Sequence, residues 1–246
     1  MKYWLFSLLV TTILGVLIWL VFFGGWRTMQ TVYLIARISP FERVIEGAPT
    51  ILVIGDSTAY GTGVRRSEES LAGLIAADWP DYSVRTRAGN GWNSAVVRQR
   101  LPELVTENEQ YAAVVVQIGA NDIIQDRPLT ESQADVRIIF KTLQHYTDHI
   151  VWLHSGDIGG ALRFSGSQAD VLSERTWRFR AMAQELAKDY GVTYVDLWRD
   201  AADDPIRLHP DRYIAIDGLH LTAAGYAHWY EKVRTALQTQ LPLEQE

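Results

Sequence analysis

Residues 50–57 read Thr-Ile-Leu-Val-Ile-Gly-Asp-Ser, and this stretch decides the fold class. Four aliphatic residues in succession, between Pro49 and Gly55, predict a strand that is buried on both faces. A serine directly after such a strand lies at the carboxyl edge of a sheet, where open α/β folds bind their ligands. A single serine at this position more often caps the next helix than reacts. The role of Ser57 therefore depends on what else reaches that edge.

The rest of the chain alternates between apolar runs and stretches with helical periodicity. This alternation predicts an α/β fold with a parallel sheet of five strands covered by helices on both faces. The strands are expected at 50–54, 83–87, 112–118, 149–153 and 192–196. Helices are expected near 67–78, 94–105, 131–147, 170–190 and 222–238.

Composition narrows the function classes. The 246 residues are 48% hydrophobic and 21% charged, which suits one globular domain with a sizeable core. The net charge of −6 and the absence of a basic stripe argue against nucleic acid as a partner. The chain has no cysteine, which excludes disulfides and thiolate catalysis. Oligomeric state is open.

The N-terminus has a different character, because no residue from Trp4 to Trp26 is charged. This apolar stretch predicts a single-pass transmembrane anchor over 1–26, with a cleavable signal peptide as the alternative. Residues 27–48 are then a tether, and 49–246 form the folded domain. The basic residues that follow the stretch nominally keep the domain cytoplasmic, whereas the two-residue segment before it resembles an export signal. We expect a membrane-bound protein; the side of the membrane on which the domain lies stays open, with the extracytoplasmic side favoured.

Four short polar signals follow the strands or precede the last helix. In a parallel α/β sheet they meet at one edge, which is a stronger indication of a site than any one of them. They are Gly55-Asp56-Ser57, Arg87-Ala88-Gly89-Asn90-Gly91, Gly119-Ala120-Asn121-Asp122 and Asp217-Gly218-Leu219-His220.

These residue types suit nucleophilic catalysis. The Ser57 hydroxyl becomes a nucleophile when an imidazole such as that of His220 removes its proton. Asp217, three residues before His220, is close enough to orient the imidazole. Attack on an acyl carbonyl builds an oxyanion that needs donors placed in advance. Candidate donors are the N–H groups of Ser57 and Gly91 and the side-chain amide of Asn121.

The four signals, in this order, resemble the conserved blocks of the SGNH/GDSL hydrolase superfamily over nearly all of residues 50–238. The resemblance implies a flavodoxin-like three-layer α/β/α sandwich, activity on esters and no metal or other cofactor. It implies Ser57 as nucleophile, His220 as base and Asp217 as its orienter. It also implies Gly91 and Asn121 as oxyanion donors, with Gly89 as the alternative to Gly91.

Two further residues are candidates for substrate binding, each with a structural alternative. Trp92 either lines the acyl pocket or has only a packing role against other side chains. His154, at the end of the fourth predicted strand, either lines the pocket or is a buried structural histidine. Asp217 and His220 lack a third ligand nearby, which makes a metal site a poor interpretation.

The leading function is a membrane-tethered serine esterase that cleaves small-molecule, lipid or glycan esters through an acyl-enzyme. An O-acyltransferase or deacetylase acting on glycans uses the same residues and is the first alternative. A non-catalytic binding module is the second. The sequence leaves the acyl chain and the alcohol of the substrate open.

Overall fold

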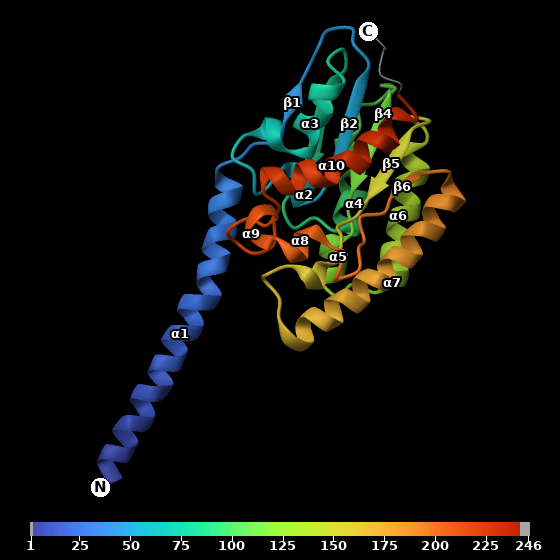
Figure 1. Cartoon of the computed structure of the whole chain (residues 1–246). Coiled ribbons are helices and arrows are strands. Elements are labelled where there is room, and N and C mark those ends of the chain that lie inside the picture. Colours follow the sequence, from blue (N-terminus) through green and yellow to red (C-terminus); the bar gives the residue numbers. More distant parts are fainter. Residues whose placement is uncertain (1, 242–246) are drawn as a thin grey trace.

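The computed structural model describes residues 2–241 and builds them around one six-stranded sheet (Figure 1). The strands are β1 (Glu42–Arg43), β2 (Thr50–Gly55), β3 (Ser83–Ala88), β4 (Ala113–Gln117), β5 (Ile150–Leu153) and β6 (Thr193–Val195). Their order across the sheet is β1-β3-β2-β4-β5-β6. β2 to β6 run parallel, at the positions of the five predicted strands. β1 pairs antiparallel with β3 at the edge and, with only two residues, has no apolar pattern that could predict it.

Helices connect the strands and flank the sheet. The α-helices are α1 (Lys2–Ala36), α2 (Ser57–Tyr60), α3 (Leu71–Asp78), α4 (Ser94–Leu104), α5 (Ala120–Ile124), α6 (Leu129–Leu143), α7 (Gly166–Tyr190), α8 (Pro205–Leu208), α9 (Pro210–Tyr213) and α10 (Ala223–Gln238). Two 3₁₀ turns, η1 (Ser67–Glu69) and η2 (Ile158–Gly160), lie in the loops.

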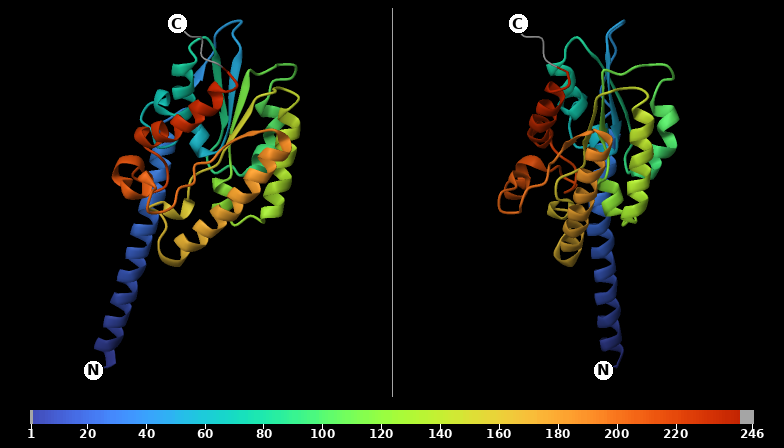
Figure 2. Two further views of the ribbon diagram at one scale, coloured as in Figure 1. Left: turned by 45° about the vertical axis from the view of Figure 1, so that its right-hand side comes forward. Right: turned by 90° about the vertical axis from the view of Figure 1, so that its right-hand side faces the viewer.

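The central strand β2 divides its side chains between two hydrophobic cores. Ile51 and Val53 belong to the core formed with α3 and α10. Leu52 and Ile54 point the other way, into the core formed with α4, α6 and α7. Because successive strand residues face opposite sides, the continuous apolar run of β2 is what a sheet covered on both faces requires. Figure 2 shows the resulting three layers, with the sheet seen between two sets of helices. The α/β/α architecture predicted from the sequence is confirmed.

The register of the central strands brings their carboxyl ends to one level. Gly55 at the end of β2 lies opposite Ala88 of β3 and Gln117 of β4. The loops that follow these three strands therefore begin side by side. This places the segments around Ser57, Gly91 and Asn121 at the same edge of the sheet.

The prediction of a transmembrane anchor over 1–26 is wrong. Among the residues that the structure describes, no helix has the combination of length and apolar character that crossing a membrane requires. The apolar stretch instead forms part of the longer helix α1, which continues past Trp26 to Ala36 without a break. Its C-terminal turns lie against the folded domain, where Arg27 donates to the carbonyl of Leu162 at 2.9 Å. The predicted single-pass membrane localisation rested on this anchor and is wrong as well.

Candidate active site

Ser57, His220 and Asp217 form one chain of hydrogen bonds, although Ser57 is 163 residues away from His220 in the sequence. Ser57 Oγ lies 3.0 Å from His220 Nε2. His220 Nδ1 lies 2.6 Å from Asp217 Oδ2. Asp217 and His220 are both buried, and Ser57 lines a cavity. This is the geometry in which an imidazole can take a proton from a hydroxyl while a carboxylate holds its other nitrogen.

Local structure fixes the position of Ser57. Asp56 caps α2 by accepting a hydrogen bond from the Thr58 N–H at 2.8 Å, and Ser57 is the first residue of that helix. The first N–H groups of a helix have no partner within it. The Ser57 N–H is therefore available to a ligand at the sheet edge. Asp56 has the capping role, while Ser57 presents its hydroxyl to His220.

The turn 217–220 is held by its own aspartate. Asp217 Oδ1 accepts hydrogen bonds from the backbone N–H groups of Leu219 and His220, each at 3.1 Å. Short polar side chains commonly stabilise turns by bonding to backbone groups two or three residues further on. The same carboxylate thus shapes the turn with one oxygen and contacts the imidazole with the other.

The candidate oxyanion donors lie on the neighbouring loops. Gly91 has a φ of +78°, a conformation that glycine adopts without steric cost, and it lines the cavity. The Gly89 N–H is already used, since it donates to the carbonyl of Gly55 at 3.1 Å. Asn121 also lines the cavity, and its amide nitrogen donates to the carbonyl of Trp92 at 3.0 Å. Because an amide nitrogen carries two hydrogens, a second donor remains for a ligand.

The cavity beside Ser57 has a volume of about 440 Å³. This lies within the range of pockets that hold drug-sized ligands. Its apolar lining comes from several loops and helices: Ile35, Ala120, Ile124, Ile158, Ala161, Phe164, Leu197, Ile206, Ile214, Leu219, Leu221 and Trp229. An ion pair between Asp157 and Arg207, at 2.7 Å, joins the segment that begins η2 to helix α8, and both segments supply part of this wall.

The structure places neither Trp92 nor His154 among the residues that line this cavity. The Trp92 ring packs against Gly89, where a Cβ atom would come within 2.1 Å of it, and beneath the guanidinium of Arg100. His154 is buried beside Phe179, with 5.5 Å between the ring centroids. Burial lowers the pKa of His154 to about 4, so it is a neutral part of the core.

Comparison with protein-family models shows the family of the chain. Residues 53–228 match the model of the GDSL-like lipase/acylhydrolase family, which is most of the sequence and includes every candidate site residue. The chain belongs to this family. A comparison with curated proteins gave no significant match. Family membership, together with the Ser57–His220–Asp217 geometry, makes the chain a carboxylic ester hydrolase of the SGNH type.

Solved structures share the fold of this hydrolase. A lipase/acylhydrolase from Enterococcus faecalis superposes with a TM-score of 0.60 at 20% identity, covering 80% of this chain and 100% of the other. The acetylxylan esterase Axe2 from Geobacillus stearothermophilus has a TM-score of 0.58 at 18% identity, covering 85% and 97%. The esterase EstA from Pseudoalteromonas sp., in a structure inhibited by monoethylphosphonate, has a TM-score of 0.58 at 19% identity, covering 78% and 98%. At these identities the likeness concerns the fold.

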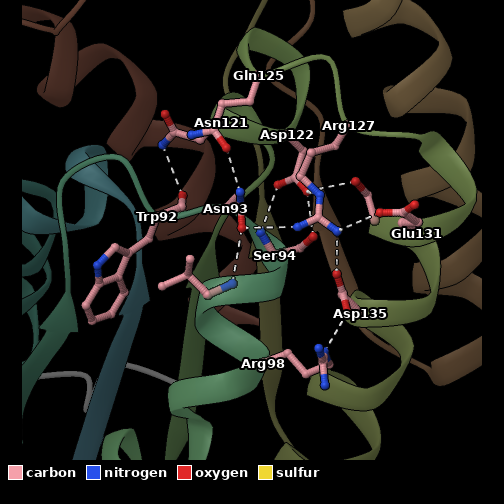
Figure 3. A network of polar contacts seen from close by, with 12 residues as sticks. Trp92, Asn93, Ser94, Arg98, Asn121, Asp122, Gln125, Arg127, Glu131 and Asp135 are labelled. Atoms are coloured by element: carbon pink, nitrogen blue, oxygen red, sulfur yellow. Dashed lines mark hydrogen bonds and ion pairs between the residues drawn. The ribbon is translucent and has the colours of Figure 1, made fainter.

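A polar network in the hydrolase ties the two candidate oxyanion loops together (Figure 3). Asn93 donates to Gln125 at 2.6 Å, and Gln125 donates back to the carbonyl of Gly91 at 3.2 Å. The buried Asp122 lies next to Asn121 and accepts hydrogen bonds from Ser94, which begins α4. Gly91, on the loop before α4, and Asn121, in the short helix α5, are thus held by segments that support each other.

The electrostatics of the site differ between its two carboxylates. Burial opposes the charged form of Asp217, but the hydrogen bond and charge of His220 and the two turn N–H groups outweigh it. They hold the pKa of the Asp217 carboxyl well below its usual range, so it is ionised beside the imidazole. Burial raises the pKa of Asp56 to about 6, despite the hydrogen bond from Thr58 and the nearby His220. Asp56 therefore titrates near neutrality.

Two residues that contact this site were missed by the sequence analysis. Thr31 of α1 donates to Asp217 Oδ2 at 2.9 Å, and Arg163 donates to Thr31 at 3.2 Å. Neither residue lies in a motif or follows a predicted strand. No pattern in the sequence indicates these contacts, because they join segments that are far apart along the chain.

Proposed function

We propose that this hydrolase cleaves carboxylic esters through an acyl-enzyme formed on Ser57. The observation that carries the proposal is the continuous hydrogen-bonded chain from Ser57 Oγ through His220 to Asp217 at the wall of an open cavity. Both distances in that chain, 3.0 Å and 2.6 Å, are within hydrogen-bonding range.

Acylation begins when Ser57 Oγ attacks the carbonyl carbon of the ester and His220 Nε2 takes the hydroxyl proton. Asp217, held ionised, stabilises the imidazolium that forms and keeps Nδ1 as the donor toward itself. The tetrahedral intermediate then collapses. The bond to the alcohol oxygen breaks, and His220 returns the proton to that leaving group.

The developing oxyanion is stabilised by the N–H of Ser57, the N–H of Gly91 and the second hydrogen of the Asn121 amide. Such donors act strongly because they are already oriented before charge develops. The hydrogen bond from Asn121 to the Trp92 carbonyl and that from Gln125 to the Gly91 carbonyl support this orientation.

Deacylation repeats the steps with water in place of the serine. His220 takes a proton from water, the hydroxide attacks the acyl carbon, and the intermediate releases Ser57, which recovers its proton from His220. The net reaction consumes one ester and one water and yields one carboxylic acid and one alcohol.

The cavity lining supports an ester that carries an apolar group of several carbons. A cavity of about 440 Å³ is far larger than an acetyl group requires, and aliphatic and aromatic side chains cover much of its wall. Burial of each additional methylene is worth about 0.8 kcal/mol when the wall accommodates it. We therefore expect kcat/KM to increase with chain length before the cavity is filled.

A glycan ester is the second candidate. It is supported by the acetylxylan esterase activity stated for Axe2 and by the polar residues Asp157, Arg163 and Arg207 in the cavity wall. A sugar hydroxyl could then act either as the leaving group, in deacetylation, or as the acyl acceptor, in transfer. Acetylated xylo-oligosaccharides as substrates, and free sugars as acceptors during turnover of a simple ester, distinguish these reactions.

The experiment that tests the proposal compares the wild type with Ser57→Ala on 4-nitrophenyl esters from acetate to decanoate. Wild-type turnover together with loss of activity in a folded Ser57→Ala variant is the expected result. Turnover that survives in Ser57→Ala rules out the acyl-enzyme on Ser57. Absence of turnover on every ester and acetylated sugar favours a binding module instead.

A further inference from the structure

The second oxygen of Asp217 has a partner from outside its own turn. Asp217 Oδ2 receives His220 Nδ1 at 2.6 Å and also the hydroxyl of Thr31 at 2.9 Å. Thr31 lies on α1, 186 residues away from Asp217 in the sequence. The other donors to this carboxylate, the N–H groups of Leu219 and His220, belong to the turn itself.

The Thr31 hydroxyl is oriented by a second contact. Arg163 Nη1 donates to Thr31 Oγ1 at 3.2 Å, which occupies the acceptor side of the hydroxyl. Its single proton then has two acceptors within reach, the carbonyl of Arg27 at 3.1 Å and the carboxylate of Asp217 at 2.9 Å. Hydrogen bonds to an ionised acceptor are the shorter and stronger kind. The proton therefore lies toward Asp217.

Helix α1 is anchored so that Thr31 cannot easily move away. Arg27, one turn before Thr31, donates to the carbonyl of Leu162 at 2.9 Å. Its guanidinium lies over Gly218, where a Cβ atom would come within 2.1 Å of Arg27 Nη1. The Arg163 N–H in turn donates to the Gly218 carbonyl at 2.8 Å. These contacts join α1, the 162–163 loop and the Asp217 turn in one cluster.

The pattern of exposure along this part of α1 is that of a helix with one face packed against the domain. Between residues 27 and 36 the less exposed positions are Arg27, Gln30, Thr31, Leu34 and Ile35. This spacing of three and four residues places them on one side of the helix. Thr31 and Ile35 also line the cavity beside Ser57. The C-terminal turns of α1 therefore form part of the site.

We propose that Thr31 is a positioning residue of the catalytic site, which holds Asp217 Oδ2 toward His220 through its hydroxyl. This inference rests on the proposed function of Ser57, His220 and Asp217. Asp217 positions the imidazole, and Thr31 limits the motion of the Asp217 carboxylate through Oδ2, the oxygen to which the turn N–H groups do not bond. The N-terminal helix thereby contributes to catalysis without contacting the substrate's reacting atoms.

The test replaces Thr31 by valine, which keeps the branched shape and removes only the hydroxyl, and by serine, which keeps the hydroxyl. In the valine variant we expect kcat for a 4-nitrophenyl ester to fall about tenfold, equivalent to about 1.4 kcal/mol. KM should stay near wild type, serine should restore kcat, and the Tm should fall by no more than a few degrees, because one hydrogen bond to a buried carboxylate is lost. Thr235→Val is the matched control, since this exposed threonine, among the described residues, donates only to the carbonyl four residues before it.

A double-mutant cycle with Asp217→Asn shows whether Thr31 acts through Asp217. The readout is the rate at which a fluorophosphonate labels Ser57, which remains measurable in slow variants. If Thr31 acts through the carboxylate, Thr31→Val should slow labelling far less in the Asp217→Asn background than in the wild type. Equal slowing in both backgrounds overturns the inference.

Failure of this inference is distinguishable from failure of the proposed function. Wild-type turnover and its loss in Ser57→Ala test the proposed function in the same experiment. If these hold while Thr31→Val retains wild-type kcat, or if Thr31→Ser is as slow as Thr31→Val, only the role of Thr31 is wrong.

Discussion

Ser94 donates two hydrogen bonds to the carboxylate of Asp122, from its backbone N–H at 2.9 Å and from its hydroxyl at 2.5 Å. Ser94 begins α4 just after the loop that carries Gly91, and Asp122 directly follows Asn121. The pair therefore links the two loops that carry candidate oxyanion donors. Arg127 lies 3.5 Å from the same carboxylate and 2.8 Å from Asp135, which extends the link to α6 (Figure 3).

Ser94→Ala is expected to weaken this link. Loss of a buried hydrogen bond to a charged group should lower the free energy of unfolding by about 1–3 kcal/mol, measured by urea denaturation. It should also lower kcat, because the two loops lose part of their mutual support. Ser132→Ala is the matched control, since Ser132 donates to the same Asp122 oxygen at 2.7 Å but lies on α6. Equal losses of kcat in the two variants would show that the loop link has no special role.

Asn121→Ala tests the oxyanion assignment. Removal of one donor should lower kcat roughly 100- to 1,000-fold, because the donor acts on charge that develops in the transition state. KM should change little. Gln125→Ala, at the exposed residue that ends the same short helix, serves as the comparison and should lower kcat only a few-fold. A small effect at Asn121 would mean that the backbone donors alone stabilise the intermediate.

The size of the cavity can be tested by filling it. Ala161 lines the wall, so Ala161→Trp should raise KM for 4-nitrophenyl octanoate while leaving the kinetics on the acetate nearly unchanged. Leu162→Trp is the control at the adjacent position, where the side chain is 49% exposed and does not line the cavity. If Ala161→Trp raises KM equally for both esters, the acyl chain of the substrate does not bind beside Ala161.

The raised pKa of Asp56 predicts how the stability of the protein changes with pH. Burial raises its pKa to about 6 from 3.8, so the folded chain holds this proton more tightly than the unfolded chain does. Stability from this group is present at low pH and is lost as the pH rises through about 6. Asp56→Asn keeps an oxygen for the Thr58 N–H but cannot ionise. Relative to the wild type, it should gain about 1–3 kcal/mol of unfolding free energy between pH 4 and 7, measured by urea denaturation. A difference that is constant with pH would contradict this.

The five parallel strands of the sheet were predictable because their signal is local, whereas the two-residue edge strand β1 was not. The continuous apolar run from Ile51 to Ile54 predicts that both faces of β2 are covered, and the two cores that contain these side chains confirm this. The meeting of Ser57, Gly91, Asn121 and His220 was also predictable, because parallel strands end at one edge. Trp92 and His154 show the limit of that reasoning. Both follow strands that end at this edge, but whether a side chain faces the cavity or the core depends on packing that adjacency in sequence does not reveal.

The N-terminal helix was the part that the sequence analysis interpreted wrongly. A run without charges from Trp4 to Trp26 suggests a membrane span by composition, yet the helix continues to Ala36 and its docked face is polar as well as apolar. Arg27 and Thr31 gain partners outside α1 because the 162–163 loop and the Asp217 turn fold beside them. Contacts between segments so far apart in the sequence leave no periodic pattern from which they could be predicted.

The most direct test of the nucleophile is to label the protein with a fluorophosphonate and to locate the adduct by peptide mass spectrometry. A stoichiometric adduct on Ser57, lost in Ser57→Ala and slowed in His220→Ala, is the result we predict. Labelling at another residue, or no labelling of a folded protein that hydrolyses esters, would contradict Ser57 as the nucleophile.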